Sequence, residues 1–194
     1  MKTGLFFGSF NPIHIGHLAI ANYMVEFTDL EEIWFVVSPH NPLKSKEILI
    51  SGITRLAMVN LAIGNDTRIK TCDIELSLPQ PSYTINTLNH LTEKYPVREF
   101  VIVMGADGLT NFDKWKCHDE ISDKYQRYVY PRPGLPSGLL SDIKNGRIID
   151  APLMDISSTF IREAIETGKD VRYFVTSRVW DFIRDNQLYL PPKY

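Results

Sequence analysis

The chain carries two histidines, His14 and His17, within the stretch 8–17. Both lie at the start of a helical pattern, where N–H groups without intrahelical acceptors favour anions, so one phosphate could meet both imidazoles. Gly8 precedes the pair and Gly16 lies between its two members, and both let the backbone approach a ligand closely. Two alternatives are simple capping of the helix and, more weakly, a zinc site, for which no third ligand lies at a suitable spacing. The stretch therefore predicts a phosphate-binding loop.

Cationic and hydroxyl side chains follow other predicted elements. Lys44 follows an apolar strand over 33–37 and two prolines that stiffen the loop. A lysine taken alone is more often a solvated surface residue, but this position is suited to a phosphate. Ser157 and Ser158 open a helical pattern with Arg162 one turn on, which predicts an anion clamp of hydroxyls, N–H groups and a guanidinium. The alternative is a capped amphipathic helix with a surface arginine.

Composition and charge exclude several classes of protein. The 194 residues are 44% hydrophobic and 23% charged, which is typical of one globular domain. With 21 Lys+Arg against 23 Asp+Glu, the chain lacks the positive excess of nucleic-acid-binding proteins. Its two cysteines have no metal-binding spacing, and its longest apolar runs are too short to span a membrane. We therefore expect a cytoplasmic protein without a nucleic-acid or membrane partner.

Short apolar runs alternate with helical patterns along the chain. We expect strands over 5–7, 33–37, 68–74, 100–104, 128–130 and 147–149, and helices from 17, 51, 82 and 157 and over 176–185. This alternation predicts an α/β fold, in which a doubly wound parallel sheet carries helices on both faces. We expect one domain over 1–194, with the helical segment from about 155 to 194 packed on it. In such sheets ligands bind beyond the carboxyl ends of the strands, so the loops after Phe7, Val37 and Met104 should form one site.

The stretch 8–17 resembles a known signature. His14-Ile15-Gly16-His17 is similar to the HxGH motif of the nucleotidyltransferase superfamily, which class I aminoacyl-tRNA synthetases share. Gly8-Ser9-Phe10-Asn11-Pro12 resembles the opening loop of the adenylyltransferase branch, although Phe7 stands where a glycine is common and Asn11 where Asp is frequent. The resemblance implies a Rossmann-like sheet of the nucleotidyltransferase type.

Further segments resemble, in the same order, the bacterial nicotinate-nucleotide adenylyltransferase family. They are the loop 38–44, Pro-Ser-Tyr-Thr at 81–84, Gly-Ala-Asp at 105–107 with Trp115 after it, Arg-Pro-Gly at 132–134, and Ile-Ser-Ser-Thr-Phe-Ile-Arg at 156–162. Leu188-Tyr189 fits the end of the family's closing helix, so the resemblance extends over essentially the whole chain. Arg55 also fits the helix after the second loop, although by itself it is expected at the surface.

The resemblance implies transfer of AMP from ATP to nicotinate mononucleotide, with Mg²⁺ carried on the ATP, no metal site in the protein, and a place in NAD biosynthesis. The implied catalytic residues are His14, His17, Lys44 and Arg162. The implied ATP-binding residues are Gly8, Ser9, Phe10, Gly16, His17, Gly105, Asp107, Ser157, Ser158, Thr159 and Arg162. The implied pyridine-nucleotide-binding residues are Asn11, Lys44, Ser82, Tyr83, Thr84, Trp115 and Arg132.

The side chains in the last of these groups have chemistry that suits a pyridine nucleotide. The indole of Trp115 can stack on an electron-poor pyridinium, and donors at Tyr83 and Thr84 can receive a carboxylate. Taken singly, Trp115 is expected to pack a helix and Ser82 to cap one. Only the ordered set of motifs favours the functional interpretation.

Other functions remain as alternatives. Phosphopantetheine adenylyltransferases share the opening loop, but they are usually shorter and have Thr-x-Gly-His where this chain has His14-Ile15-Gly16-His17. A class I tRNA synthetase needs several hundred residues, an anticodon-binding region and a basic face. A non-catalytic nucleotide-binding module would be expected to lose one of His14, His17, Lys44 and Arg162, which are all present. The choice of nicotinate over nicotinamide mononucleotide follows from the resemblance alone, and the oligomeric state is not predicted.

Overall fold

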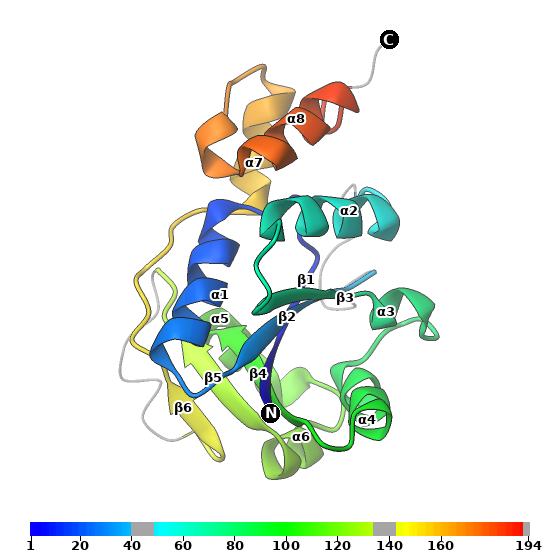
Figure 1. Cartoon of the computed structure of the whole chain (residues 1–194), viewed down its shortest axis with the longest axis vertical. Coiled ribbons are helices and arrows are strands. Elements are labelled where there is room, and N and C mark those ends of the chain that lie inside the picture. Colours follow the sequence, from blue (N-terminus) through cyan, green and yellow to red (C-terminus); the bar gives the residue numbers. More distant parts are fainter. Residues whose placement is uncertain (40–48, 134–142, 192–194) are drawn as a thin grey trace.

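The computed structural model describes residues 1–39, 49–133 and 143–191. Within these ranges the chain forms a six-stranded sheet of order β3-β2-β1-β4-β5-β6, in which every neighbouring pair is parallel (Figure 1). The strands are β1 (Lys2–Gly8), β2 (Glu32–Val37), β3 (Ile69–Cys72), β4 (Glu99–Gly105), β5 (Gln126–Tyr130) and β6 (Gly146–Ile148). The predicted doubly wound parallel sheet is therefore confirmed.

Helices cover both faces of this sheet (Figure 1). One face shares a hydrophobic core with α1 (Ile15–Phe27), α2 (Gly52–Ile63), α7 (Ser158–Glu166) and α8 (Ser177–Asp185). The other face packs on α3 (Ile74–Ser77), α4 (Thr84–Lys94), α5 (Ala106–Leu109) and α6 (His118–Lys124). Two short 3₁₀ helices, η1 (Phe112–Lys114) and η3 (Arg172–Phe174), complete the described elements.

Serine side chains cap two of the three helices that were predicted to start at a serine, at positions 51, 82 and 157. Ser51 caps α2 by accepting from the N–H of Thr54 at 3.1 Å, and Ser157 caps α7. The prediction that Ser82 caps a helix is wrong, because α4 begins at Thr84 and its N-cap is Tyr83, without a side-chain cap. Cap signals locate a helix start only to within one or two residues. Helix α6 and the single-turn elements were not predicted.

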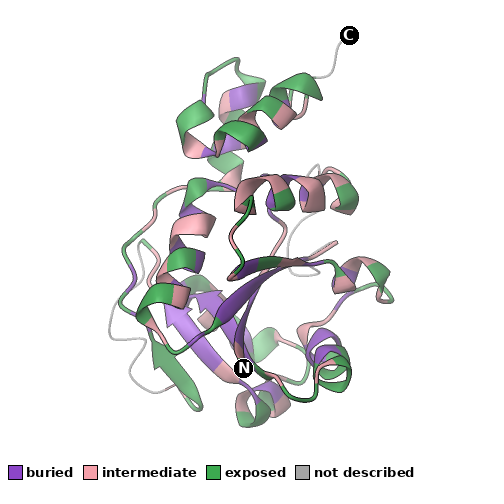
Figure 2. Cartoon of the chain, viewed as in Figure 1, coloured by how far each residue is buried: buried purple, intermediate pink, exposed green. Residues whose placement is uncertain are grey.

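The carboxyl ends of the central strands lie at one edge of the sheet. β1 lies between β2 and β4, where the strand order changes direction, and Gly8 at its end is opposite Val37. β4 ends on the other side of β1, at Gly105. Figure 2 shows these central strands buried, whereas β6 at the sheet edge is exposed. The loops that follow β1, β2 and β4 therefore leave the sheet at its switch point, where α/β folds bind ligands.

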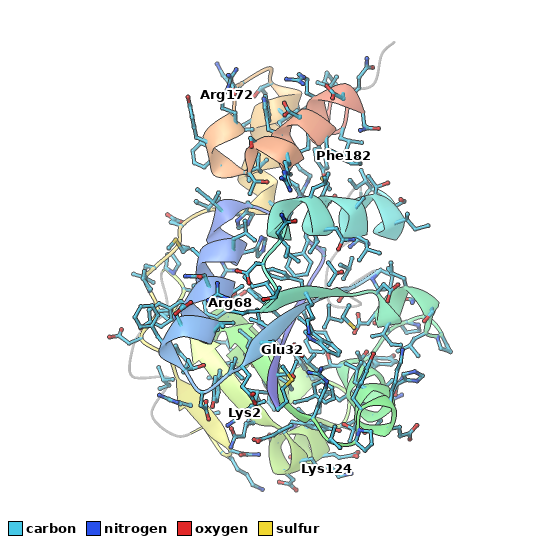
Figure 3. The ribbon with its side chains drawn as sticks, viewed as in Figure 1. Lys2, Glu32, Arg68, Lys124, Arg172 and Phe182 are labelled. Carbon is cyan, nitrogen blue, oxygen red and sulfur yellow. The ribbon has the colours of Figure 1, made fainter. Side chains whose placement is uncertain are left out.

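The amino-terminal edge is closed by a buried carboxylate. Glu32 at the start of β2 is 1% exposed and makes ion pairs with Lys70 and Arg98. It also accepts from Trp34 Nε1 at 2.8 Å. In Figure 3, Glu32 and Lys2 mark the starts of β2 and β1. These bonds satisfy the buried charge of Glu32.

The C-terminal helices form a layer on α2. α8 packs against α2, and buried residues of α7 and α8 belong to the same core as α1. In Figure 3, Arg172 and Phe182 lie on this layer at the top of the view. Among the described residues, no helix combines the length and apolar character needed to cross a membrane.

The loops after β1 and β2 are held together by Arg55 of α2. Its guanidinium donates through Nη1 to the carbonyls of Ser9 and Ser38 at 2.5 and 2.7 Å, and through Nη2 to Pro39 at 3.1 Å. Its Nε donates to Ile50 at 3.0 Å, and the residue is 1% exposed. The expectation of a surface arginine is therefore wrong. Guanidinium donors match carbonyls that lose their strand partners where the sheet ends.

We predict that Arg55→Met destabilises the protein by about 2–4 kcal/mol, because it leaves several buried carbonyls without donors. Urea denaturation measures this loss. Arg184→Met is the control, since Arg184 is 59% exposed and its ion pairs with Asp181 and Asp185 lie on the surface. A loss of stability for Arg55→Met no larger than that of the control would contradict the role of Arg55 in holding the two loops together.

Candidate functional site

Two stacked imidazoles lie where the loop between β1 and α1, residues 9–14 and here called loop 1, meets the first turn of α1. The rings of His14 and His17 lie 3.7 Å apart at 28°. His14 is the N-cap of α1, and its backbone N–H donates to Nδ1 of His17 at 3.3 Å. A neutral His17 whose Nδ1 accepts a hydrogen bond carries its proton on Nε2. The loop thus fixes His17 as an N–H donor through Nε2.

His14 is a neutral group in this site. It is only 4% exposed, and burial together with the positive charge of Arg132 lowers its pKa to about 4. Its Nδ1 is buried and has no hydrogen-bond partner within the described ranges. At pH 7 His14 can therefore exchange hydrogen bonds with a phosphate but brings no positive charge to it.

Both histidines line one narrow pocket with Arg132 and Gly16. Its remaining lining residues are Phe6, Ile20, Tyr130, Pro131, Met154 and Ile156. A Cβ at position 16 would lie 3.1 Å from His14 Nδ1, so glycine leaves the space that the imidazole needs. Residues that were predicted to bind ATP therefore line the same pocket as Arg132, which was predicted to bind the pyridine nucleotide.

Helix α5, which starts directly after β4, touches the same arginine. Nε of Arg132 lies 3.4 Å from Oδ1 of Asp107, and its guanidinium lies 5.6 Å from the Tyr130 ring centroid. A Cβ at Gly105 would lie 2.4 Å from that carboxylate oxygen, so a larger residue would displace the carboxylate. Gly105 and Asp107, both predicted for ATP, therefore lie beside Arg132 at the edge of the histidine pocket.

The start of α7 is bonded directly to loop 1. Ser158 Oγ donates to the carbonyl of Pro12 at 2.8 Å, and Arg162 Nη1 donates to the carbonyl of Asn11 at 2.9 Å. Arg162 Nη2 also lies 3.3 Å from Thr159 Oγ1, while Ser157 Oγ accepts from the N–H of Phe160 at 3.1 Å. The three hydroxyls predicted to bind ATP thus have protein partners. These bonds hold the helix start and Arg162 against loop 1, and the predicted contacts of the hydroxyls with ATP stay a prediction.

The interior of loop 1 is closed to solvent. Phe10 and Asn11 are each 1% exposed, and a Cβ at Gly8 would lie 2.7 Å from the Phe10 ring. Phe10 has a left-handed φ of 47° and packs edge-on to His17 at 5.1 Å. The Phe10 side chain therefore belongs to the core. The carbonyl of Ser9 accepts from Arg55.

A second group of predicted residues lies beside α4. Nζ of Lys116 lies 4.4 Å from the Tyr83 ring centroid, which joins the segment after η1 to the start of α4. Trp115 is half-buried, 5.4 Å from the Phe112 ring, and Ser82 is buried. Thr84 is the first residue of α4. This group packs on the opposite face of the sheet from α1, whereas Lys44 lies outside the described residues.

Sequence reasoning missed several residues of the site. Arg55 was assigned to the helix after the second loop, but its burial and its carbonyl partners were not predicted, and Lys116 could have been found only as a cation next to Trp115. Tyr189 Oη donates to Oδ1 of Asn11 at 3.0 Å, across 178 positions of the chain. Met154 and Ile156 line the histidine pocket from the segment before α7. Their apolar side chains carried no chemical signal in the sequence.

Comparisons with known proteins agree with this geometry. Residues 5–164 match the model of the cytidylyltransferase-like family. A probable nicotinate-nucleotide adenylyltransferase of Cytophaga hutchinsonii is 48% identical over 189 residues, which cover 97% of this chain and 98% of the relative. A protein of the same name from Flavobacterium johnsoniae is 50% identical over 191 residues, which cover 97% and 99%.

Solved structures show the same fold. The Plasmodium falciparum nicotinic acid mononucleotide adenylyltransferase complexed with NaAD superposes with a TM-score of 0.81 at 20% identity, covering 97% of both chains. A Vibrio parahaemolyticus structure described as a putative nicotinate-nucleotide adenylyltransferase gives 0.74 at 21% identity, covering 98% of this chain and 96% of that one. The family model and the near full-length relatives together show that the chain belongs to the nicotinate-nucleotide adenylyltransferases of the cytidylyltransferase-like family.

Proposed function

We propose that this protein transfers AMP from ATP to nicotinate mononucleotide, releasing pyrophosphate and forming the deamido form of NAD. The observation that carries the proposal is the histidine pocket at the switch point of the sheet, with Arg132 inside it and Arg162 bonded to loop 1. Relatives that are 48% and 50% identical over nearly their whole length carry the corresponding name. The reaction would be one step of NAD biosynthesis.

The reaction needs alignment and charge neutralisation more than covalent chemistry. An oxygen of the 5′-phosphate of the mononucleotide attacks the α-phosphorus of ATP, and the bond from that phosphorus to the bridging oxygen breaks as pyrophosphate leaves. Positioning alone can supply on the order of 7–11 kcal/mol in such transfers. We assign His17 as an Nε2–H donor to the oxygens of the reacting phosphate, with neutral His14 packed against it.

Positive charge would come from side chains around the imidazoles. We assign Arg162 and Lys44 to the triphosphate, and Arg132 to the same side because it lies with His14 and Asp107. Mg²⁺ would arrive with the ATP. Among the described residues no group of three or more His, Cys, Asp or Glu side chains could hold a metal ion. A metal bound through substrate phosphates needs no such cage.

The group beside α4 suits the pyridine ring and its carboxylate. Trp115 offers an indole face, and Tyr83 and Thr84 form the start of α4, where backbone N–H groups favour an anion. Lys116 adds a cation at Tyr83. This charge favours the acid over nicotinamide mononucleotide, which is the second candidate substrate. Both cysteines are free thiols, which supports our proposal of a cytoplasmic location.

Pyrophosphate release from Mg·ATP tests the proposed function. The assay compares nicotinate mononucleotide, nicotinamide mononucleotide and phosphopantetheine at equal concentrations. We expect the highest kcat/KM with the nicotinate form. No release with that substrate, or a higher kcat/KM with phosphopantetheine, would overturn the proposal.

His17→Ala is expected to lower kcat by about 10²–10³, or 2.7–4 kcal/mol, because it removes a donor that acts on the transition state. Steady-state kinetics with both substrates measures the loss. Turnover within threefold of the wild type would show that His17 is not a catalytic residue. Thermal unfolding of the variant checks that its fold is retained.

Trp115→Ala is expected to raise the KM for nicotinate mononucleotide with a smaller effect on kcat, because stacking acts on substrate and transition state alike. The KM for ATP is the internal control and should stay within about twofold. If the KM for the mononucleotide does not change, Trp115 lies outside the substrate site.

His14 should make stability depend on pH. Its pKa of about 4 in the folded protein lies below the ~6.5 of an unfolded histidine, so the unfolded chain binds more protons between these values. Stability should therefore fall as the pH drops from 6.5 towards 4, by roughly 2–3 kcal/mol at pH 4.5 from His14 alone. Urea denaturation at pH 7.5 and 4.5 of wild type and His14→Asn measures the difference. Equal losses in the two proteins would contradict it.

A further inference from the structure

The segment that follows α8 contacts loop 1. Tyr189 follows α8 and packs against the core of the α1 face. Its hydroxyl donates to Oδ1 of Asn11 at 3.0 Å, while the backbone carbonyl of Asn11 accepts from Arg162. Asn11 is 1% exposed. The residue in the middle of loop 1 is thus held from two sides by the C-terminal helical layer.

We propose that Tyr189 is a positioning residue for the adenylyl-transfer site, which it orders by fixing the side-chain amide of Asn11. Its effect on catalysis rests on the proposed function, whereas its effect on loop 1 does not. Tyr189 contacts the buried Asn11 of loop 1, and it takes no part in the reaction itself.

The hydrogen bond selects one orientation of the amide. A phenol that donates needs an oxygen acceptor, so Oδ1 of Asn11 faces Tyr189 and the NH₂ group takes the other side. A tyrosine hydroxyl is protonated at neutral pH, and burial raises the pKa of Tyr189 further. Without this donor the amide could turn over, and a buried oxygen would lose its partner.

The backbone supports a specific role for this residue. Tyr189 has a φ of 63°, a left-handed conformation that is unfavourable for an aromatic residue. Such a conformation persists only where surrounding contacts fix it. Ser158 and Arg162 hold the neighbouring carbonyls of Pro12 and Asn11. Three side chains of the C-terminal layer therefore converge on two consecutive residues of loop 1.

Hydrogen exchange followed by mass spectrometry tests the effect on loop 1. The variants are Tyr189→Phe, which removes only the hydroxyl, and the control Tyr173→Phe, whose tyrosine is 85% exposed. In Tyr189→Phe we expect amides in a peptide over 10–18 to exchange about tenfold faster. Exchange in a peptide over β4, residues 99–105, should stay unchanged. Unchanged exchange over 10–18, or equal acceleration over 99–105, would overturn the proposal.

A double-mutant cycle with Asn11→Ala tests the route of the effect. We expect Tyr189→Phe to lower kcat/KM about tenfold in the wild-type background and less than twofold in the Asn11→Ala background. A merely structural contribution of Tyr189 would give the same factor in both, which would contradict action through Asn11. If the wild type shows no activity with nicotinate mononucleotide, the proposed function fails, and hydrogen exchange alone decides the role of Tyr189.

Discussion

The site depends on how carbonyl groups are satisfied where the central strands end. Beyond the pair Gly8 and Val37 the chain turns away from the sheet, and the next carbonyls have no strand partner. Arg55 supplies donors to both departing segments at once, through Ser9 and Ser38. One buried cation thus fixes loop 1 relative to the segment that leads to Lys44. A substrate that spans the two segments would meet a preformed surface, which lowers the entropic cost of alignment.

In the histidine pocket, burial and nearby positive charge decide which side chains are charged. His14 lies too deep, and too near Arg132, to be protonated at neutral pH. Its neutrality lets the two rings stack at 3.7 Å without repulsion between two cations. In the proposed reaction the imidazoles would supply directed hydrogen bonds, and the guanidinium groups of Arg132 and Arg162 would supply charge. Separating these tasks suits phosphoryl transfer, in which charge is spread over several oxygens while geometry must be held closely.

The strands and the loops that follow them could be predicted from the sequence, whereas contacts between residues distant in the sequence could not. Apolar runs such as 100–104 mark buried strands, and the loops after them could be assigned to one edge because the sheet is parallel. Arg55 could not be placed in this way, because an arginine inside a helical pattern carries no sign of the carbonyls that it will meet. The bond from Tyr189 to Asn11 joins positions 178 residues apart and depends on the packing of α8. Periodicity and local motifs contain no information about such distant pairs.

The segment 156–162 shows how a motif can serve a ligand indirectly. Its hydroxyls suggested phosphate contacts, yet Ser157 caps α7 and Ser158 binds the carbonyl of Pro12. Thr159 lies against the guanidinium of Arg162. These bonds set the position of a cation and of the first-turn N–H groups of α7, which are themselves suited to anions. Residue types that would fit direct binding can therefore act by building the support, and Arg162 is the member of the segment whose charge can act on the triphosphate.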